Sequence, residues 1–132
     1  MTTLAMIWLT ATTGGLVAWL TILFAKRESG NAGVAALMLA LFAGFTAVQI
    51  RQEGVIGFYT NHTRDLTGVQ VWWDLIQCTM IALFFIVPRA RRVGMNVMPW
   101  ALLVGTTASI GLLAMCARLF WLERQSGEQA AA

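Results

Sequence analysis

Four long apolar stretches, separated by short polar connections, account for most of the chain. Each stretch approaches or exceeds the roughly 20 residues that a helix needs to cross about 30 Å of hydrocarbon. Backbone groups in lipid must be paired within their own segment, and the stretches lack the alternation of barrel strands, so we expect helices. The pattern predicts an all-α fold, an integral membrane four-helix bundle, with residues 1–132 in a single transmembrane domain. The approximate helices cover residues 4–25, 32–50, 69–87 and 97–122.

The composition agrees with a membrane location. Of the 132 residues, 58% are hydrophobic and only 11% are charged, whereas about a quarter of the residues in a soluble domain are charged. The formal net charge is +3. The charged residues lie in short clusters between the apolar stretches, as in loops that flank membrane spans, and they form no basic face for nucleic acid. We therefore expect membrane lipids among the partners, and no nucleic acid.

The basic residues indicate an orientation for the four expected helices. The connections at residues 26–31 and 88–96 lie on one side of a four-span protein, and Pro88 is expected to end the third helix. These connections hold five of the nine Lys/Arg residues, namely Lys26, Arg27, Arg89, Arg91 and Arg92. The positive-inside rule places these five residues at the cytoplasmic surface, in contact with anionic lipid head groups, and both termini outside.

Two rows of small residues predict a close approach of helix backbones, because van der Waals contact drives helix association in lipid. One row is Ala36, Ala40 and Gly44, and the other is Ala101, Gly105 and Ser109. Such rows serve either ordinary packing inside a bundle or a seam between two copies of the chain, and the sequence leaves both interpretations open.

One carboxylate interrupts the apolar run at residues 69–85. Asp74 lies about five residues into the expected third helix, where an ionised carboxylate costs up to about 2.5–3.5 kcal/mol, and less near the interface. If the third and fourth helices run antiparallel, Arg118 lies about 9 Å beyond the residue opposite Asp74, at a rise of 1.5 Å per residue. These intramembrane ionisable residues predict a structural Asp74–Arg118 pair or a helix-end hydrogen bond. The alternative is a functional carboxylate that binds a proton or a cationic ligand.

Three further side chains are weaker candidates for a cofactor site. Trp72 and Trp73 suit the aromatic belt at the membrane interface, and His62, the single histidine, suits a solvated loop. Alternatively, the two tryptophans line a pocket for a lipid, quinone or pigment, and His62 ligates one pigment magnesium or haem iron. No nucleophile elbow, phosphate loop or metalloprotease helix is found, so we predict no cofactor, no metal site, no catalytic residue and no enzyme.

Three short motifs resemble a known family. They are WWDL at residues 72–75, RARRVGM at residues 89–95 and ARLFWLER at residues 117–124. This C-terminal half is similar to a family of small multi-pass bacterial membrane proteins that is catalogued as a domain of unknown function. The resemblance implies a location in the bacterial cytoplasmic (inner) membrane and no established activity.

Small size, several spans and small-residue rows favour an accessory or structural subunit of a larger membrane complex. Its partners would be other membrane-protein subunits or a second copy of the chain. One alternative is an oligomeric small transporter or proton-coupled carrier that uses Asp74, although the shallow depth of this residue argues against a midplane site. The other alternative is a lipid-, quinone- or pigment-binding membrane module that includes Trp72 and Trp73.

Overall fold

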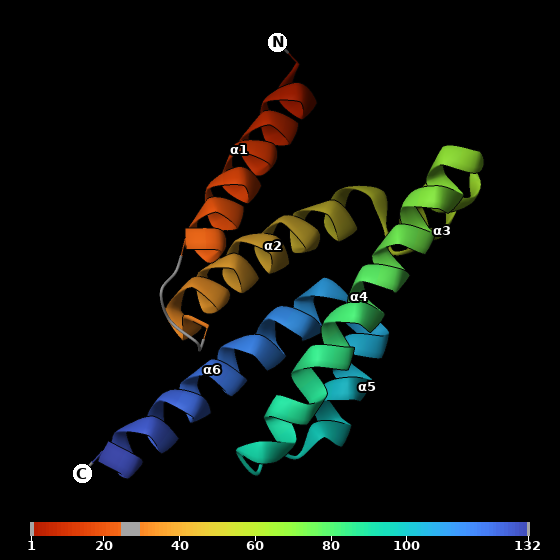
Figure 1. Cartoon of the computed structure of the whole chain (residues 1–132). Helices are drawn as coiled ribbons and strands as arrows, with labels where there is room; N and C mark the ends of the chain where they lie inside the picture. The colour runs from red at the N-terminus through yellow and green to blue at the C-terminus, as the bar shows by residue number, and fades with distance from the viewer. Residues whose placement is uncertain (1, 25–29, 132) are drawn as a thin grey trace. The chain divides into compact units, whose positions relative to one another are not determined.

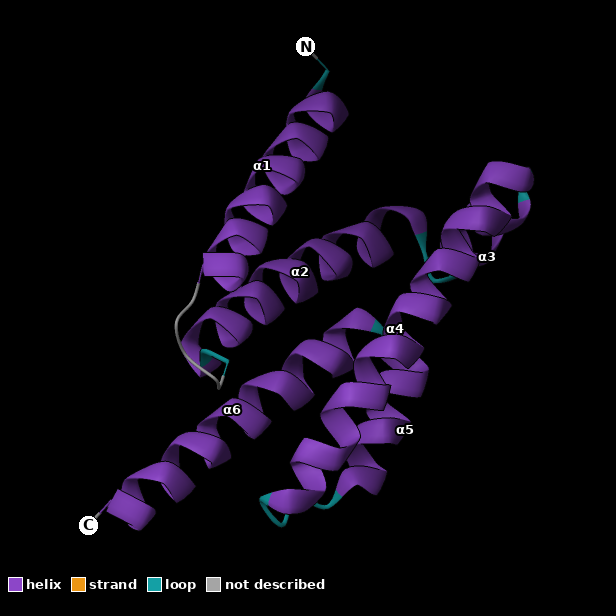
Figure 2. Ribbon diagram, in the orientation of Figure 1, coloured by secondary structure: helices purple, strands orange, loops and turns teal. Residues whose placement is uncertain are grey.

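The structure is a computed structural model that describes residues 2–24 and 30–131 (Figure 1). All regular structure in these ranges is helical, which confirms the all-α class (Figure 2). The chain divides into two compact units, Met1–Gly30 and Asn31–Ala132. The helices are α1 (Thr3–Phe24), α2 (Ala32–Glu53), α3 (Ile56–Thr63), α4 (Leu66–Arg92), α5 (Val97–Thr107) and α6 (Ser109–Ala131).

By length and composition, three helices of the described residues are able to cross a membrane: α1, α2 and α4. They indicate a membrane protein. In α1, the hydroxyls of Thr10, Thr12 and Thr21 donate to carbonyls four residues earlier, over 2.9, 2.9 and 2.8 Å. The polar groups of these side chains are therefore satisfied within the helix, as a lipid-facing helix requires.

Local capping sets the ends of α2. The Asn31 side chain accepts hydrogen bonds from the backbone N–H groups of Gly33 and Val34, at 2.9 and 3.3 Å. These bonds satisfy donors that the first turn of a helix leaves unpaired. The helix ends at Gly54, whose φ of 75° is a left-handed conformation that glycine adopts easily. Helix α2 runs antiparallel to α6 and packs along it (Figure 1).

The helix expected at residues 69–87 is longer at both ends. It begins at Leu66, where the Asp65 carboxylate caps it by accepting from the Gly68 N–H at 2.8 Å. It continues through Pro88 to Arg92, so the prediction that Pro88 ends the helix is wrong. Tertiary contacts hold the last turns in place, because Ala90 is completely buried in the core of this unit.

The expected single helix over residues 97–122 is also wrong, because the backbone turns at Ala108. Ala108 has φ 48° and ψ −112°, which a helix cannot accommodate. Beyond the turn, the Thr107 hydroxyl accepts from the Gly111 N–H at 3.0 Å. The backbones of α5 and α6 touch here, since a Cβ added to Gly111 would lie 2.6 Å from the Val104 nitrogen. The result is a helical hairpin in place of a fourth straight span.

The core lies where this hairpin meets the C-terminal part of α4. Its buried members are Ala90, Met95, Val104, Met115 and Leu119. The described residues form six helices, three of them long and apolar enough to cross a membrane, so the integral membrane four-helix bundle stays a prediction. The single domain over residues 1–132 stays a prediction.

Candidate functional site

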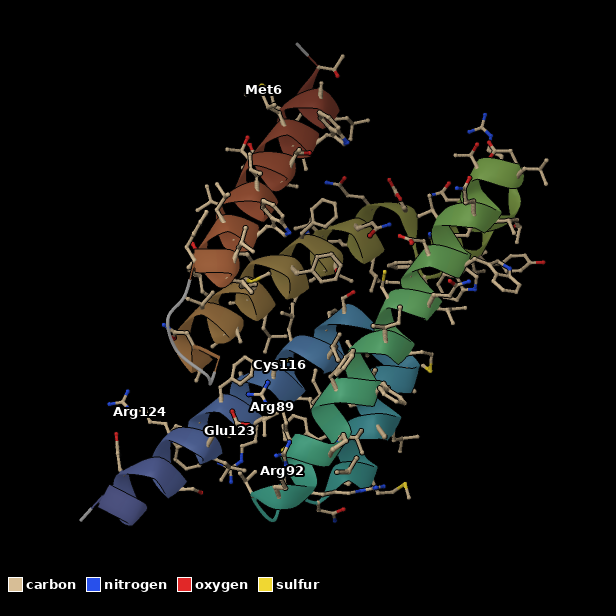
Figure 3. The ribbon with its side chains drawn as sticks, in the orientation of Figure 1. Met6, Arg89, Arg92, Cys116, Glu123 and Arg124 are labelled. Carbon is tan, nitrogen blue, oxygen red and sulfur yellow. The ribbon has the colours of Figure 1, made fainter. Side chains whose placement is uncertain are left out.

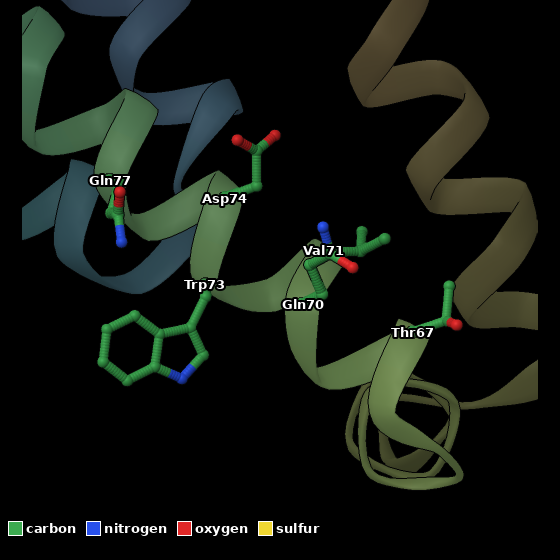
Figure 4. A pocket seen from close by; sticks show the side chains of 6 residues that line it. All are labelled: Thr67, Gln70, Val71, Trp73, Asp74 and Gln77. Carbon is green, nitrogen blue, oxygen red and sulfur yellow. The ribbon is translucent and has the colours of Figure 1, made fainter.

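The first half of α4 carries a polar face. Thr67, Gln70, Asp74 and Gln77 recur at intervals of three and four residues, so they lie on one side of the helix. Together with Val71 and Trp73 they line a shallow, open pocket (Figure 4). We call these four polar residues the α4 polar face. All six lining residues belong to α4, so the pocket is open on the side that faces away from this helix.

Asp74 is exposed within the described chain. Its side chain makes a weak contact on the same helix, in which the Cys78 thiol donates to Asp74 Oδ1 over 3.8 Å. Gln70 and Gln77, one helical turn away on either side, are exposed as well. The carboxylate and amide oxygens of such a face can accept hydrogen bonds from a cation. The indole ring can stack against the same cation.

The expected Asp74–Arg118 pair is not formed. Arg118 lies over the Trp121 ring, with Cζ 4.3 Å from the ring centroid. The salt bridges among the described residues join Arg89 to Glu123 and Arg124 to Glu128. The physical reason is the turn at Ala108, which directs α6 back toward the C-terminal end of α4, away from Asp74.

Arg89 and Glu123 form the connection that the sequence analysis missed. Arg89 Nε donates to Glu123 Oε1 at 2.9 Å and Nη2 donates to Oε2 at 2.7 Å, a two-pronged geometry that suits a guanidinium (Figure 3). The Phe120 ring lies 5.5 Å from Arg89 Cζ. The sequence placed Arg89 only at the membrane surface, and the available signal was Glu123, the first carboxylate after the last apolar stretch.

The other basic residues divide into two groups. Arg91 and Arg92 are exposed in the last turn of α4, where positive charge also favours the carbonyl end of the helix dipole. Lys26 and Arg27 lie outside the described residues. The contact of all four with lipid head groups stays a prediction.

Most residues of the two small-residue rows are exposed in the structure. Ala36, Ala40 and Gly44 are all exposed, whereas the face of α2 that includes the buried Ala35 is turned inward. The second row is mixed, with Ala101 and Ser109 half-buried and Gly105 exposed. Packing inside the unit therefore does not use the first row, and a seam between two copies of the chain stays a prediction.

His62 and Trp72 meet where α3 folds back on α4. Their ring centroids are 5.3 Å apart, and His62 Nδ1 lies 2.6 Å from the Phe58 carbonyl oxygen. Since a carbonyl only accepts, Nδ1 is the donor. Trp73 instead lines the pocket beside Asp74. A search of residues 2–24 and 30–131 finds no group of three His, Cys, Asp or Glu side chains able to hold a metal.

Comparisons with protein-family models, curated proteins and solved structures found no match for this chain. The resemblance of residues 72–75, 89–95 and 117–124 to an uncharacterised bacterial family therefore stays a prediction.

Proposed function

We propose that this protein is an accessory or structural subunit of a larger complex in the bacterial inner membrane. The observation that carries the proposal is the open polar face of α4, a helix long and apolar enough to span a membrane. Polar side chains that face lipid are costly, and a neighbouring helix removes that cost by hydrogen bonding across the interface. A partner helix on the α4 polar face is the arrangement that satisfies these groups.

Gentle purification from the native membrane tests this function. We expect the chain to elute with other polypeptides in fixed proportion. The double variant Gln70→Leu/Gln77→Leu should co-purify with much less of these polypeptides, because it removes the amides on either side of Asp74. Gln125→Leu is the matched control, since Gln125 is exposed on α6 and does not line the α4 pocket. A wild-type chain that elutes as a stable solitary monomer would contradict the proposal.

We also propose an orientation in which α1, α2 and α4 cross the membrane and the α5–α6 hairpin enters it and leaves on the same side. Helix α5 has 11 residues, so it is about 16 Å long, roughly half of the hydrocarbon thickness. The Arg89–Glu123 pair supports the return of α6, because it joins the far part of α6 to the C-terminal end of α4.

This orientation strengthens the asymmetry of basic charge. Arg118 and Arg124 join the five residues already assigned to the cytoplasmic side, which makes seven, and two of the nine Lys/Arg residues, Arg51 and Arg64, remain outside. The arrangement with both termini outside divides the basic residues less unequally between the two sides of the membrane. The positive-inside rule therefore favours a C-terminus in the cytoplasm and an N-terminus outside.

A further inference from the structure

The charge of Asp74 restricts what covers the α4 polar face. Asp74 is the only charged residue of α4 before Arg89. It lies eight residues after Leu66, which is about 12 Å along the helix axis. It is exposed in the described chain, on a helix long and apolar enough to cross a membrane. An ionised carboxylate in this setting needs a counter-charge.

We propose that the occupant is a transmembrane helix of a different polypeptide that presents a Lys or Arg to Asp74. This inference rests on the proposed function and specifies the partner. The pocket offers a matching set of acceptors, because Gln70 and Gln77 carry amide oxygens one turn on either side of the carboxylate (Figure 4). A Lys ammonium has three donors and an Arg guanidinium five, so either group has donors left over after it pairs with the carboxylate.

Trp73 adds a second reason for a cation. Its ring lines the pocket next to the carboxylate and is 62% exposed. The face of an indole attracts an ammonium or guanidinium group, and the attraction is stronger where water is excluded. A carboxylate, two amides and an indole on one helix face are complementary to a basic side chain that is held by a second helix.

Among the described residues, no basic side chain forms a salt bridge with Asp74. Helix α1 has no charged residue between Thr3 and Phe24. A second copy in the same orientation would bring its own Asp74 to the same depth, and two ionised carboxylates repel each other. Arg51 lies in the last turn of α2 and Arg64 follows α3, and neither forms a salt bridge with Asp74.

A photo-crosslinking amino acid at Gln70 of the full chain, in its native membrane, tests the inference. Ile76 is the control position, because it is exposed about 3 Å beyond Asp74 along the helix axis and on the other side of α4. We expect a crosslink from position 70 and little from position 76. The crosslinked peptide, identified by mass spectrometry, should come from another protein and carry a Lys or Arg within one turn of the attachment point.

Variants that change the charge of Asp74 provide a second test of the inference. Asp74→Asn keeps the shape and should reduce the co-purified partner at least tenfold, whereas Asp74→Glu should retain most of it. Asp74→Lys should abolish association, and the reciprocal change of the partner's basic residue to Asp should restore it. The melting temperature of each variant, measured in detergent, separates lost binding from lost folding.

The outcomes distinguish the two proposals. A chain without crosslinks and without co-purified polypeptides overturns both. A complex that survives Asp74→Asn unchanged, or a crosslinked helix without a basic residue, overturns only the inference about the cation. A crosslink between two copies of this chain also overturns it, because the occupant is then the chain itself.

Discussion

The pairing of Arg89 with Glu123 is the strongest polar contact between separate helices of the second unit. The two side chains retain 31% and 16% of their exposure, so the pair is partly shielded from solvent. Partial shielding strengthens the attraction relative to a fully solvated pair, and it makes an unpaired remnant costly. The second pair, between Arg124 and Glu128, spans one turn of α6 at 77% and 64% exposure, where ion pairs contribute little.

A double-mutant cycle separates the two pairs. We expect Arg89→Gln and Glu123→Gln each to destabilise the fold, with a coupling of about 1–2 kcal/mol between them, because each change leaves the other group without its partner. Arg124→Gln and Glu128→Gln should show no measurable coupling. Thermal unfolding in detergent, followed by circular dichroism, measures both cycles. Stronger coupling in the α6 pair would show that solvent shielding does not decide the strength of these contacts.

At the scale of elements, the turn between α5 and α6 depends on glycine. Gly111 is buried, and a Cβ there would meet the Leu103 carbonyl carbon and oxygen at 2.7 Å as well as the Val104 nitrogen. These atoms belong to the backbone, so they cannot rotate away as a side chain would. The close approach of the two helices is therefore incompatible with any larger residue.

Gly111→Ala should open the hairpin. We expect a loss of about 1–3 kcal/mol, the usual cost of overpacking a filled core. Gly105→Ala is the matched control, because its added Cβ would have nothing within 4 Å, and it should be neutral. Thermal unfolding of the two variants in detergent provides the comparison. Equal melting temperatures would mean that the α5–α6 contact does not stabilise the protein.

At the scale of the whole molecule, the proposed position of the C-terminus depends on the hairpin. A straight fourth helix would carry the chain across the membrane, whereas a hairpin that returns at Ala108 brings it back to the side of Arg89. The two arrangements use the same apolar residues, so hydropathy alone does not separate them.

Reporter fusions after Ala132 distinguish the two arrangements in bacterial cells. We expect a green fluorescent protein fusion to fluoresce and an alkaline phosphatase fusion to be inactive, because the former folds in the cytoplasm and the latter needs export. The same pair of fusions after Gly54, between α2 and α3, is the control and should give the opposite result. An active phosphatase after Ala132 would mean that α6 crosses the membrane and both termini lie outside.

The sequence by itself determined the helical class, the apolar character of the chain and the approximate positions of α1, α2 and α4. Each of these depends on residues that are near one another along the chain, because helical hydrogen bonds and transfer into lipid are local and close to additive. The spacing of the α4 polar face is equally local. The capping oxygens of Asn31 and Asp65 act within the first turn of their own helices.

Only the tertiary structure decided the features that join distant residues. The turn at Ala108 depends on two backbones that meet at Gly111, and no residue type there forbids a straight helix. Arg89 and Glu123 are 34 positions apart, and they become neighbours only after that turn is made. Which face of α2 is buried, the face of Ala35 or the adjacent face of Ala36, depends on how α6 packs against this helix. These outcomes depend on packing geometry, which a linear pattern of apolar and polar residues does not contain.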